Sequence, residues 1–179
     1  KTMPTNLLVI SALGDDRPGI IDELAGLITE SGCSIEDSRM TVLGADVAMV
    51  MMVEGRWNEL AKLEAGLPAA GRRLNLQINA KRTTTAVPSG NRLPYTVEVV
   101  SIDHPGIVQH LAGFFSTRGI NIREMATTTY TTAHTGTPMF QVHMTVDVAA
   151  SQHIARLREE FMDLCDQLNL DAIIEPAKL

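Results

Sequence analysis

The 179-residue chain is 45% hydrophobic with few aromatic residues, a composition typical of a globular protein whose core consists of aliphatic side chains and methionine. Its formal net charge of −6 argues against direct binding of nucleic acid, because contacts with phosphates need clustered lysine and arginine. The two cysteines, Cys33 and Cys165, and the lack of an apolar run long enough to span a bilayer predict a cytoplasmic protein without a disulfide framework or membrane contact.

The first half of the chain predicts the order strand, helix, strand, strand, helix, strand. Apolar runs at Leu7 to Ala12 and Leu74 to Ala80 predict the first and fourth strands, and the runs Ile35 to Leu43 and Val47 to Val53 predict a hairpin between them. Helical spacing of apolar side chains predicts the two helices. These side chains are Ile20, Leu24, Leu27 and Ile28 in the first helix and Leu60, Leu63 and Leu67 in the second.

A turn-rich segment follows the first half. Residues 83–93 contain Thr83-Thr84-Thr85 and Pro88-Ser89-Gly90, a composition that favours a linker over a packed element. We therefore predict a first domain at residues 1–82, the linker at residues 83–93 and a second domain at residues 94–179.

The second half repeats the same order with a longer hairpin tip. Strands are predicted at Tyr95 to Ser101, Asn121 to Tyr130, Met139 to Val146 and Asp171 to Glu175, with a polar tip at Thr131 to Pro138. The helices are predicted by Ile107, Leu111, Phe114 and Phe115, then by Ile154, Leu157, Phe161, Leu164 and Leu168. Both halves therefore predict an α+β fold of two ferredoxin-like βαββαβ domains in tandem, each with two helices on one face of an antiparallel sheet.

Further signals concern the helix ends and surfaces. Gly32 and Gly119 are expected to end the first helix of each half, because glycine adopts the left-handed conformation of a helix C-terminus. Asn58 and Ser151 are the expected N-caps of the second helices. The charged run Arg156 to Glu160 is expected to be a solvent-exposed helix face.

An Asp-x-Pro-Gly-Ile motif joins the first strand to the first helix in each half, as Asp16 to Ile20 and Asp103 to Ile107. A glycine without a Cβ lets a ligand approach the backbone, and the free N–H groups and positive dipole end of the helix attract a carboxylate. The aspartate either caps the helix or binds an ammonium group. A small zwitterion is therefore a suitable ligand, and simple helix initiation is the alternative.

Other chemistry is weakly supported. The five histidines form no Cys/His cluster with zinc-like spacing, so we expect neither a metal nor a cofactor. Cys33 has no evident neighbouring base, and no catalytic Ser/His/Asp, phosphate-loop or paired-carboxylate motif is present. We therefore expect no enzymatic activity. His104 lies inside the second turn, where it contacts a ligand or caps the helix and makes that turn pH-sensitive.

These motifs resemble the ACT domain, a small-molecule-sensing module that usually binds amino acids, and the resemblance covers essentially the whole chain. It depends on Gly14 to Ile20, on Gly32 to Met40 with Leu43-Gly44 after it, and on their counterparts in the second half. Two such domains without a catalytic domain resemble the glycine cleavage system transcriptional repressor family. This resemblance implies a regulator that engages a LysR-type activator instead of DNA, with glycine as the favoured amino acid.

The resemblance also implies where the ligand binds: at a domain interface, between the strand-to-helix turn of one domain and the start of the second strand of the same or a neighbouring domain. In the first half the implied residues are Asp16, Pro18, Gly19, Ile20, Ser34 and Ile35. In the second half they are Asp103, His104, Pro105, Gly106, Ile107, Asn121 and Ile122. The family often has asparagine before this isoleucine, and only the second half retains it.

Two function classes remain. The first is a non-enzymatic amino-acid-sensing regulator of glycine cleavage genes that acts through a protein partner. The alternative is a detached ACT regulatory subunit of an amino-acid or one-carbon metabolism enzyme, and an acylphosphatase-like enzyme ranks last because no phosphate cradle is evident. Unpaired groups on the edge strands of two small sheets further predict close association of the halves and a homodimer.

Overall fold

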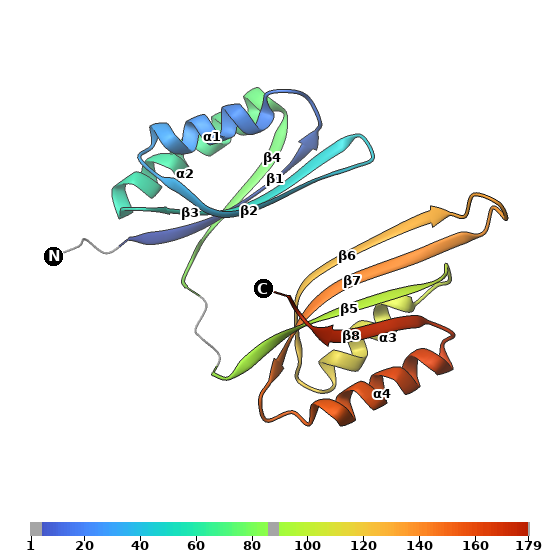
Figure 1. Cartoon of the computed structure of the whole chain (residues 1–179). Helices are drawn as coiled ribbons and strands as arrows, with labels where there is room; N and C mark the ends of the chain where they lie inside the picture. The colour runs from blue at the N-terminus through green and yellow to red at the C-terminus, as the bar shows by residue number, and fades with distance from the viewer. Residues whose placement is uncertain (1–4, 86–89, 179) are drawn as a thin grey trace. The chain divides into compact units, whose positions relative to one another are not determined.

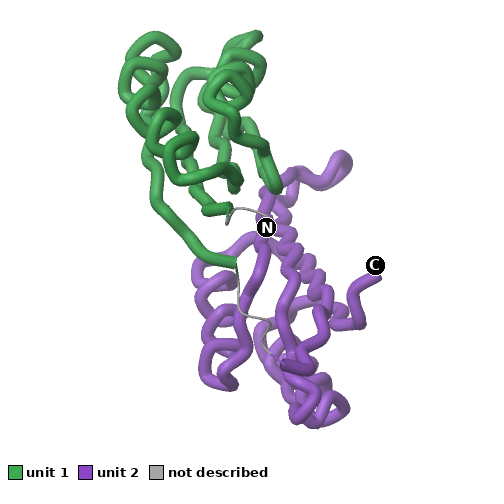
Figure 2. The backbone as a smooth tube through the Cα atoms, turned by 90° about the vertical axis from the view of Figure 1, so that its left-hand side faces the viewer, with its two compact units in different colours: residues 1–87 green, residues 88–179 purple. Residues whose placement is uncertain are grey.

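The computed structural model describes residues 5–85 and 90–178. The chain divides into two compact units, residues 1–87 and 88–179 (Figure 2). Each unit has the order β-α-β-β-α-β, which confirms the predicted α+β fold of two ferredoxin-like domains in tandem. Within the described residues, no helix combines the length and the apolar character needed to cross a bilayer.

The first unit forms one antiparallel sheet with helices on a single face (Figure 1). Its elements are β1 Asn6–Asp15, α1 Ile20–Glu30, β2 Ser34–Leu43, β3 Asp46–Gly55, α2 Trp57–Leu74 and β4 Leu76–Thr83. The strand order is β2-β3-β1-β4, so β2 and β4 are the edges. The face opposite α1 and α2 carries no helix of this unit, and every residue of β2 is exposed.

The second unit repeats this arrangement with a longer hairpin (Figure 1). Its elements are β5 Arg92–Ile102, α3 Ile107–Ser116, β6 Asn121–Thr131, β7 Pro138–Ala149, α4 Ile154–Gln167 and β8 Asp171–Pro176. The strand order is β6-β7-β5-β8. In the hairpin tip, the Thr137 N–H donates to Thr132 Oγ1 at 3.1 Å and the Thr132 N–H donates to the Thr137 carbonyl at 3.0 Å. A threonine hydroxyl therefore adds to the hydrogen bonding of the tip, where β6 and β7 no longer pair.

Buried and more exposed residues alternate along the strands, so one face of each sheet contributes to the core. In β1, Leu8, Ile10 and Ala12 are buried beneath the helices, whereas the residues between them face the other side of the sheet. The first core is aliphatic and methionine-rich, as the composition predicts. The second core adds an aromatic cluster in which the rings of Phe114 and Phe115 lie edge to face with centroids 5.1 Å apart.

The helix ends differ partly from the expectation. Gly32 and Gly119 follow α1 and α3 with φ of 85° and 67°, as predicted. Asn58 is not the N-cap of α2: the cap is Arg56, two residues earlier, because the Glu59 carboxylate accepts the Arg56 N–H at 2.8 Å. Ser151 is not the cap of α4 either. That cap is His153, whose Nδ1 accepts the N–H of Arg156 at 3.3 Å.

The strands next to the linker are longer than predicted. Thr83 belongs to β4, where it pairs with Leu7, and Arg92 belongs to β5, where it pairs with Ala149. The cross-strand partners provide backbone hydrogen bonds that override the turn-like composition of this stretch. At the other end of β4 the prediction placed Leu74 in the strand, but Leu74 is the last residue of α2. Part of the predicted linker, residues 86–89, lies outside the described residues.

Candidate functional site at the strand-to-helix turns

The two Asp-x-Pro-Gly turns are attached to their sheets in the same way. The Asp16 N–H donates to the Ala45 carbonyl, and the Asp103 N–H donates to the Pro138 carbonyl, both at 3.0 Å. Both aspartates are exposed, and among the described residues neither carboxylate has a hydrogen bond or ion pair. Of the two predicted uses of these carboxylates, capping the helix is therefore not observed, and both remain accessible to a cation.

The glycine of each turn has a conformational role that the sequence analysis did not identify. Gly19 and Gly106 are the N-caps of α1 and α3, with φ of 91° and 87°. A residue with a side chain rarely adopts this left-handed region. A Cβ added at Gly19 would meet no atom within 4 Å. The positive φ angle therefore requires glycine at this position, although there is room for a side chain beside it.

The helix start is the electropositive part of each turn. The first helical bond of α1 runs from the Glu23 N–H to the Gly19 carbonyl at 3.0 Å, so the three preceding N–H groups have no partner in the helix. The first turn of α1 carries the carboxylates of Asp22 and Glu23, whereas that of α3 carries no acidic residue. Glu23 is paired with Arg17 at 3.8 Å and with Arg73 at 3.7 Å, so Asp22 is the carboxylate that repels an anion. The start of α3 is therefore the stronger site for a ligand carboxylate.

The predicted second-strand residues lie at the other end of each unit. Asp15 at the end of β1 pairs with Asp46 at the start of β3, whereas Ser34 at the start of β2 pairs with Glu54 near the end of β3. The length of α1, roughly 16 Å for 11 residues, separates the turn from Ser34. The fold therefore does not bring the two predicted groups together within one unit. The same holds for Asp103 and Asn121.

A surface depression of about 420 Å³ lies at the start of β6. Its lining residues are Ala112, Ser116, Gly119, Ile120, Asn121 and Ile122. A Cβ added at Gly119 would meet nothing within 4 Å, so this depression is open. In the first unit the carboxylate of Glu59 lies against the corresponding Gly32. Glu59 is held there by its bond to the N-terminus of α2, so the equivalent space in the first unit is partly filled.

A depression of about 320 Å³ lies beside the first turn. It is lined by Leu13, Gly14, Asp15, Asp46, Asn75, Leu76 and Gln77. Gly14 is needed here for packing, because an added Cβ would collide with the Asn75 carbonyl. The amide of Asn75 donates to Asp15 Oδ2 at 2.8 Å. In the second unit Ser101 occupies the position of Gly14 and is buried, with its hydroxyl bonded to the Ile102 carbonyl at 2.9 Å.

The two cysteines and the candidate metal ligands were the remaining reactive groups to place. Both cysteines are buried and free, and burial raises the pKa of the Cys165 thiol to about 11. Burial also raises the pKa of Cys33, and the nearby charge of Glu59 acts in the same direction. Thiols with raised pKa values are poor nucleophiles at neutral pH. Among residues 5–85 and 90–178, no three His, Cys, Asp or Glu side chains group as metal ligands would.

Comparison with known proteins identifies the family. The ACT domain model matches residues 6–81. The glycine cleavage system transcriptional repressor of Escherichia coli (strain K12) is 32% identical over 167 residues, which cover 93% of this chain and 88% of that protein. The chain belongs to the glycine cleavage system transcriptional repressor family.

Solved structures agree with this assignment. The crystal structure of a protein described as a glycine cleavage system transcriptional repressor has 29% sequence identity and a TM-score of 0.73, and the match covers 99% of this chain and all of that one. A protein of unknown identity from Galdieria sulphuraria has 24% identity and a TM-score of 0.79 over 98% of this chain and all of its own. The second similarity concerns the fold alone.

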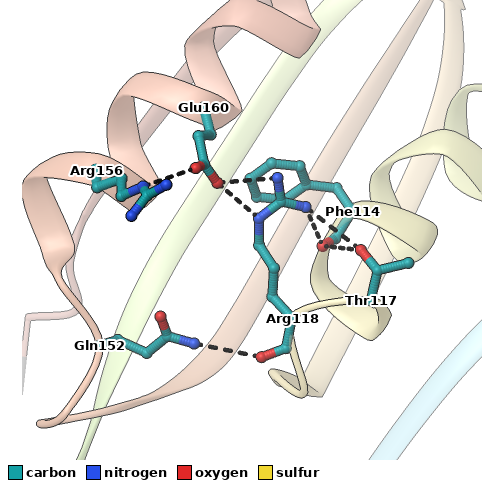
Figure 3. Close-up of polar contacts among 6 residues, drawn as sticks. All are labelled: Phe114, Thr117, Arg118, Gln152, Arg156 and Glu160. Carbon is teal, nitrogen blue, oxygen red and sulfur yellow. Dashed lines mark hydrogen bonds and ion pairs between the residues drawn. The ribbon is translucent and has the colours of Figure 1, made fainter.

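This family member also has a groove between α3 and α4 that the sequence analysis missed. Figure 3 shows the contacts of Arg118 beside it. It measures about 760 Å³, and the Arg118 guanidinium lies 3.7 Å from the centroid of the Phe114 ring beside it. Arg118 also binds Glu160 at 2.9 Å, and Arg156 reaches the same carboxylate at 3.2 Å. The run Arg156 to Glu160 is therefore not merely a solvent-exposed helix face. The guanidinium of Arg118 is already bound to Glu160 and stacked on Phe114. No sequence motif indicated this contact, because Arg118 and Glu160 are far apart in the sequence.

We predict opposite effects for two glycine-to-alanine changes in α1 and its cap. Gly19→Ala should lower the free energy of unfolding by about 1 kcal/mol, because alanine is strained at positive φ. Gly26→Ala, inside the helix where a Cβ meets nothing within 4 Å, should raise it by about 0.5–1 kcal/mol. Urea denaturation measures both. Equal effects of the two changes would contradict the backbone role assigned to Gly19.

We also predict that Glu160 contributes a pH-dependent part of the stability. The hydrogen bond from Arg118, and to a lesser extent Arg156, lowers the pKa of this carboxyl. A lowered pKa stabilises the folded state above the pKa of an unfolded glutamate, about 4.3, and this stabilisation is lost as the pH falls through the lowered value. Glu160→Gln should therefore reduce the melting temperature more at pH 7 than at pH 3. Glu159→Gln is the matched control, and an equal effect of both variants at pH 7 would refute the assignment.

Proposed function

We propose that the chain is a non-enzymatic sensor of a small amino acid, glycine first, that controls expression of glycine cleavage genes through a protein partner. The observation that carries the proposal is full-length similarity to a transcriptional repressor of this system, combined with two ACT units that each retain an open helix start. A LysR-type activator is the proposed partner, and a homodimer is the proposed assembly.

The second unit is the better candidate for the amino acid. Its helix α3 begins without a carboxylate in the first turn, so the free N–H groups attract the ligand carboxylate without competition. The exposed Asp103 carboxylate nearby suits the ligand ammonium group. At the far end of this unit, Asn121 lines an open depression, whereas its counterpart Ser34 already lies 3.4 Å from Glu36 Oε1. The Asn121 amide is therefore available to a ligand held by a neighbouring turn.

The negative net charge of the chain supports action through a protein partner instead of direct binding to DNA. The formal net charge of −6 is unfavourable for phosphate contacts, which need clustered cations. A ligand alters such a partnership only if it binds one arrangement of the units more tightly than another. Binding at a domain interface has this property, because the two halves of the site approach each other in only one arrangement.

We predict that glycine, in a thermal-shift panel of the twenty amino acids, stabilises the protein, with serine or alanine next. At a hundred times the dissociation constant, glycine should add about 2.7 kcal/mol to the free energy of unfolding. Glycinamide and methylamine should fail, because each lacks the carboxylate. The amino-acid proposal is wrong if no amino acid raises the melting temperature.

A matched pair of variants tests which helix start holds the carboxylate. Gln109→Asp places in α3 the carboxylate that α1 carries at the equivalent Asp22, and it should weaken glycine binding about threefold by repulsion. Asp22→Gln should leave the dissociation constant unchanged. Isothermal titration calorimetry measures both. Tighter binding with Asp22→Gln, together with no effect of Gln109→Asp, would move the site to the first unit.

The partner is tested by affinity capture from the native cell with and without glycine. We expect a LysR-type activator to be recovered, and less of it when glycine is present. Recovery of an enzyme of amino-acid or one-carbon metabolism instead would favour the alternative role of a detached regulatory subunit. The variant Gln109→Asp is the control, since its capture of the activator should respond less to glycine.

A further inference from the structure

The groove between α3 and α4 can be compared residue by residue with the packing of α1 on α2 in the first unit. Helix α1 aligns with α3 through their glycine caps. Leu67 of α2 matches Phe161 of α4, and both are buried. Asn75 and Asn169, each with φ of 55°, follow the two helices at the same interval. Each residue that lines the groove therefore has a counterpart in the first unit.

The side chains where the helices meet are small in the first unit and large in the second. Gly66 of α2 lies against Leu27 of α1, because a Cβ added at Gly66 would meet Leu27 Cδ1 at 3.5 Å. The counterparts in the second unit are Glu160 and Phe114, and the Arg118 guanidinium contacts both (Figure 3). The distance between packed helices depends on the side chains at the contact. These larger groups therefore hold α3 and α4 apart.

The ends of the helices next to the turns show the same contrast. In the first unit Glu23 Oε2 lies 3.7 Å from Arg73 Nε, an ion pair that links α1 to α2. The counterparts in the second unit are His110 and Gln167, and both line the groove. Among the described residues, these two side chains form no hydrogen bond with each other. The groove therefore stays open at this end.

The lining combines apolar side chains with one uncompensated charge. Gly113, Phe114 and Leu164 are its apolar members, and Arg118 and Glu160 neutralise each other. Asp163 also lines the groove and is exposed, and within the described part of the chain its carboxylate has no hydrogen bond or ion pair. Such a lining suits an apolar surface that carries a cation.

We propose that this groove binds an amphipathic helix of the protein partner. The apolar ridge of that helix enters between α3 and α4, and a lysine or arginine beside the ridge meets Asp163. Packing the apolar side of a helix into a groove is a common way to recognise a protein segment. The inference rests on the proposed action through a protein partner, and it assigns that action to the helical side of the second unit.

The length of the groove suits a helix. Gln109 and Thr117 both line it, and their spacing along the axis of α3 is roughly 12 Å at a rise of 1.5 Å per residue. Anchors at positions i, i+3 or i+4, and i+7 of an amphipathic helix extend about 10 Å. The volume of about 760 Å³ leaves room for such side chains. Two turns of a partner helix therefore fit along the groove.

Charge favours a basic partner over a second copy of this chain. A second copy carries the same formal net charge of −6 and the same unpaired Asp163, so the two copies repel each other. A basic helix is attracted both by the whole chain and by this carboxylate. The expected occupant is therefore a helix with leucine-like residues on one face and lysine or arginine on the other.

Binding of a defined peptide to the full-length chain tests the proposal. The probe is a fluorescein-labelled peptide of about 18 residues, long enough to form a helix, with leucine on one face and lysine on the other. One control peptide has the same composition in scrambled order, and another has glutamate in place of lysine. Fluorescence polarisation should detect binding of the first peptide only. A groove covered by the first unit or by a second copy would bind no peptide, and that result would overturn the proposal, as would equal binding of the scrambled peptide.

Filling the groove should remove peptide binding. Gly113→Leu places a side chain in the groove, where an added Cβ meets nothing within 4 Å, and should raise the dissociation constant of the peptide about tenfold or more. The matched control is Gly26→Leu at the counterpart in α1, where a Cβ also meets nothing within 4 Å. The control should leave the constant unchanged, and equal effects of the two variants would contradict the assigned surface. Circular dichroism confirms that both fold.

Reversing the charge in the groove tests the predicted contact with a cation. Asp163→Lys should weaken binding of the leucine-lysine peptide about tenfold. Glu159→Lys makes the same change in net charge on α4 outside the lining, so it should have a much smaller effect. Equal weakening by both variants would show a general effect of net charge and would refute the contact with Asp163.

The glycine response separates this proposal from the amino-acid proposal. The thermal shift with glycine should be the same for the unmodified chain and for Gly113→Leu, because the groove holds the partner and the turn holds the amino acid. A chain that binds the peptide but does not respond to glycine would reject the sensor and support the groove. Loss of the glycine response in Gly113→Leu would mean that the groove holds the amino acid, and it would overturn the partner site.

Discussion

Two helices cover only one face of each four-stranded sheet, and the rest of the molecule follows from this one-sided packing. Burial of Leu8, Ile10 and their neighbours under the helices supplies the stability of each unit. The same arrangement leaves the other face and the edges β2 and β6 without a partner in their own unit. A protein built this way is suited to association, and a ligand or partner that binds at such a surface influences how the units are arranged.

Duplication preserved the backbone and changed the surfaces. Both turns keep a left-handed glycine cap and the same bond to the following hairpin, since the change of direction from strand to helix depends on them. The side chains around this backbone differ: α1 begins with two carboxylates and α3 with none, and Glu59 lies against Gly32 while Gly119 is open. These differences support the proposal that the second unit is the one that holds the amino acid.

Sequence patterns predicted the fold well where the spacing of apolar residues agreed with the glycine and proline residues that mark the ends of elements. The periods of the strands and helices, the paired motifs and Gly32 and Gly119 indicated two βαββαβ units, and the structure confirms them. Boundaries were wrong where a distant partner decides them. Thr83 and Arg92 lie in strands because they pair with Leu7 and Ala149. The start of α2 was wrong for a local reason: the Glu59 side chain reaches back to the Arg56 N–H, so the helix begins at Trp57.

The sequence by itself determined the tandem architecture, the family and the turns that offer helix N-termini, because these depend on short-range spacing and on residue types such as glycine and proline. Only the tertiary structure decided that Asp16 and Ser34 lie at opposite ends of one unit and that Arg118 is held by Phe114 and Glu160. The physical reason is that distances across a sheet depend on strand register and helix length, which bring together or separate residues without regard to their order in the chain.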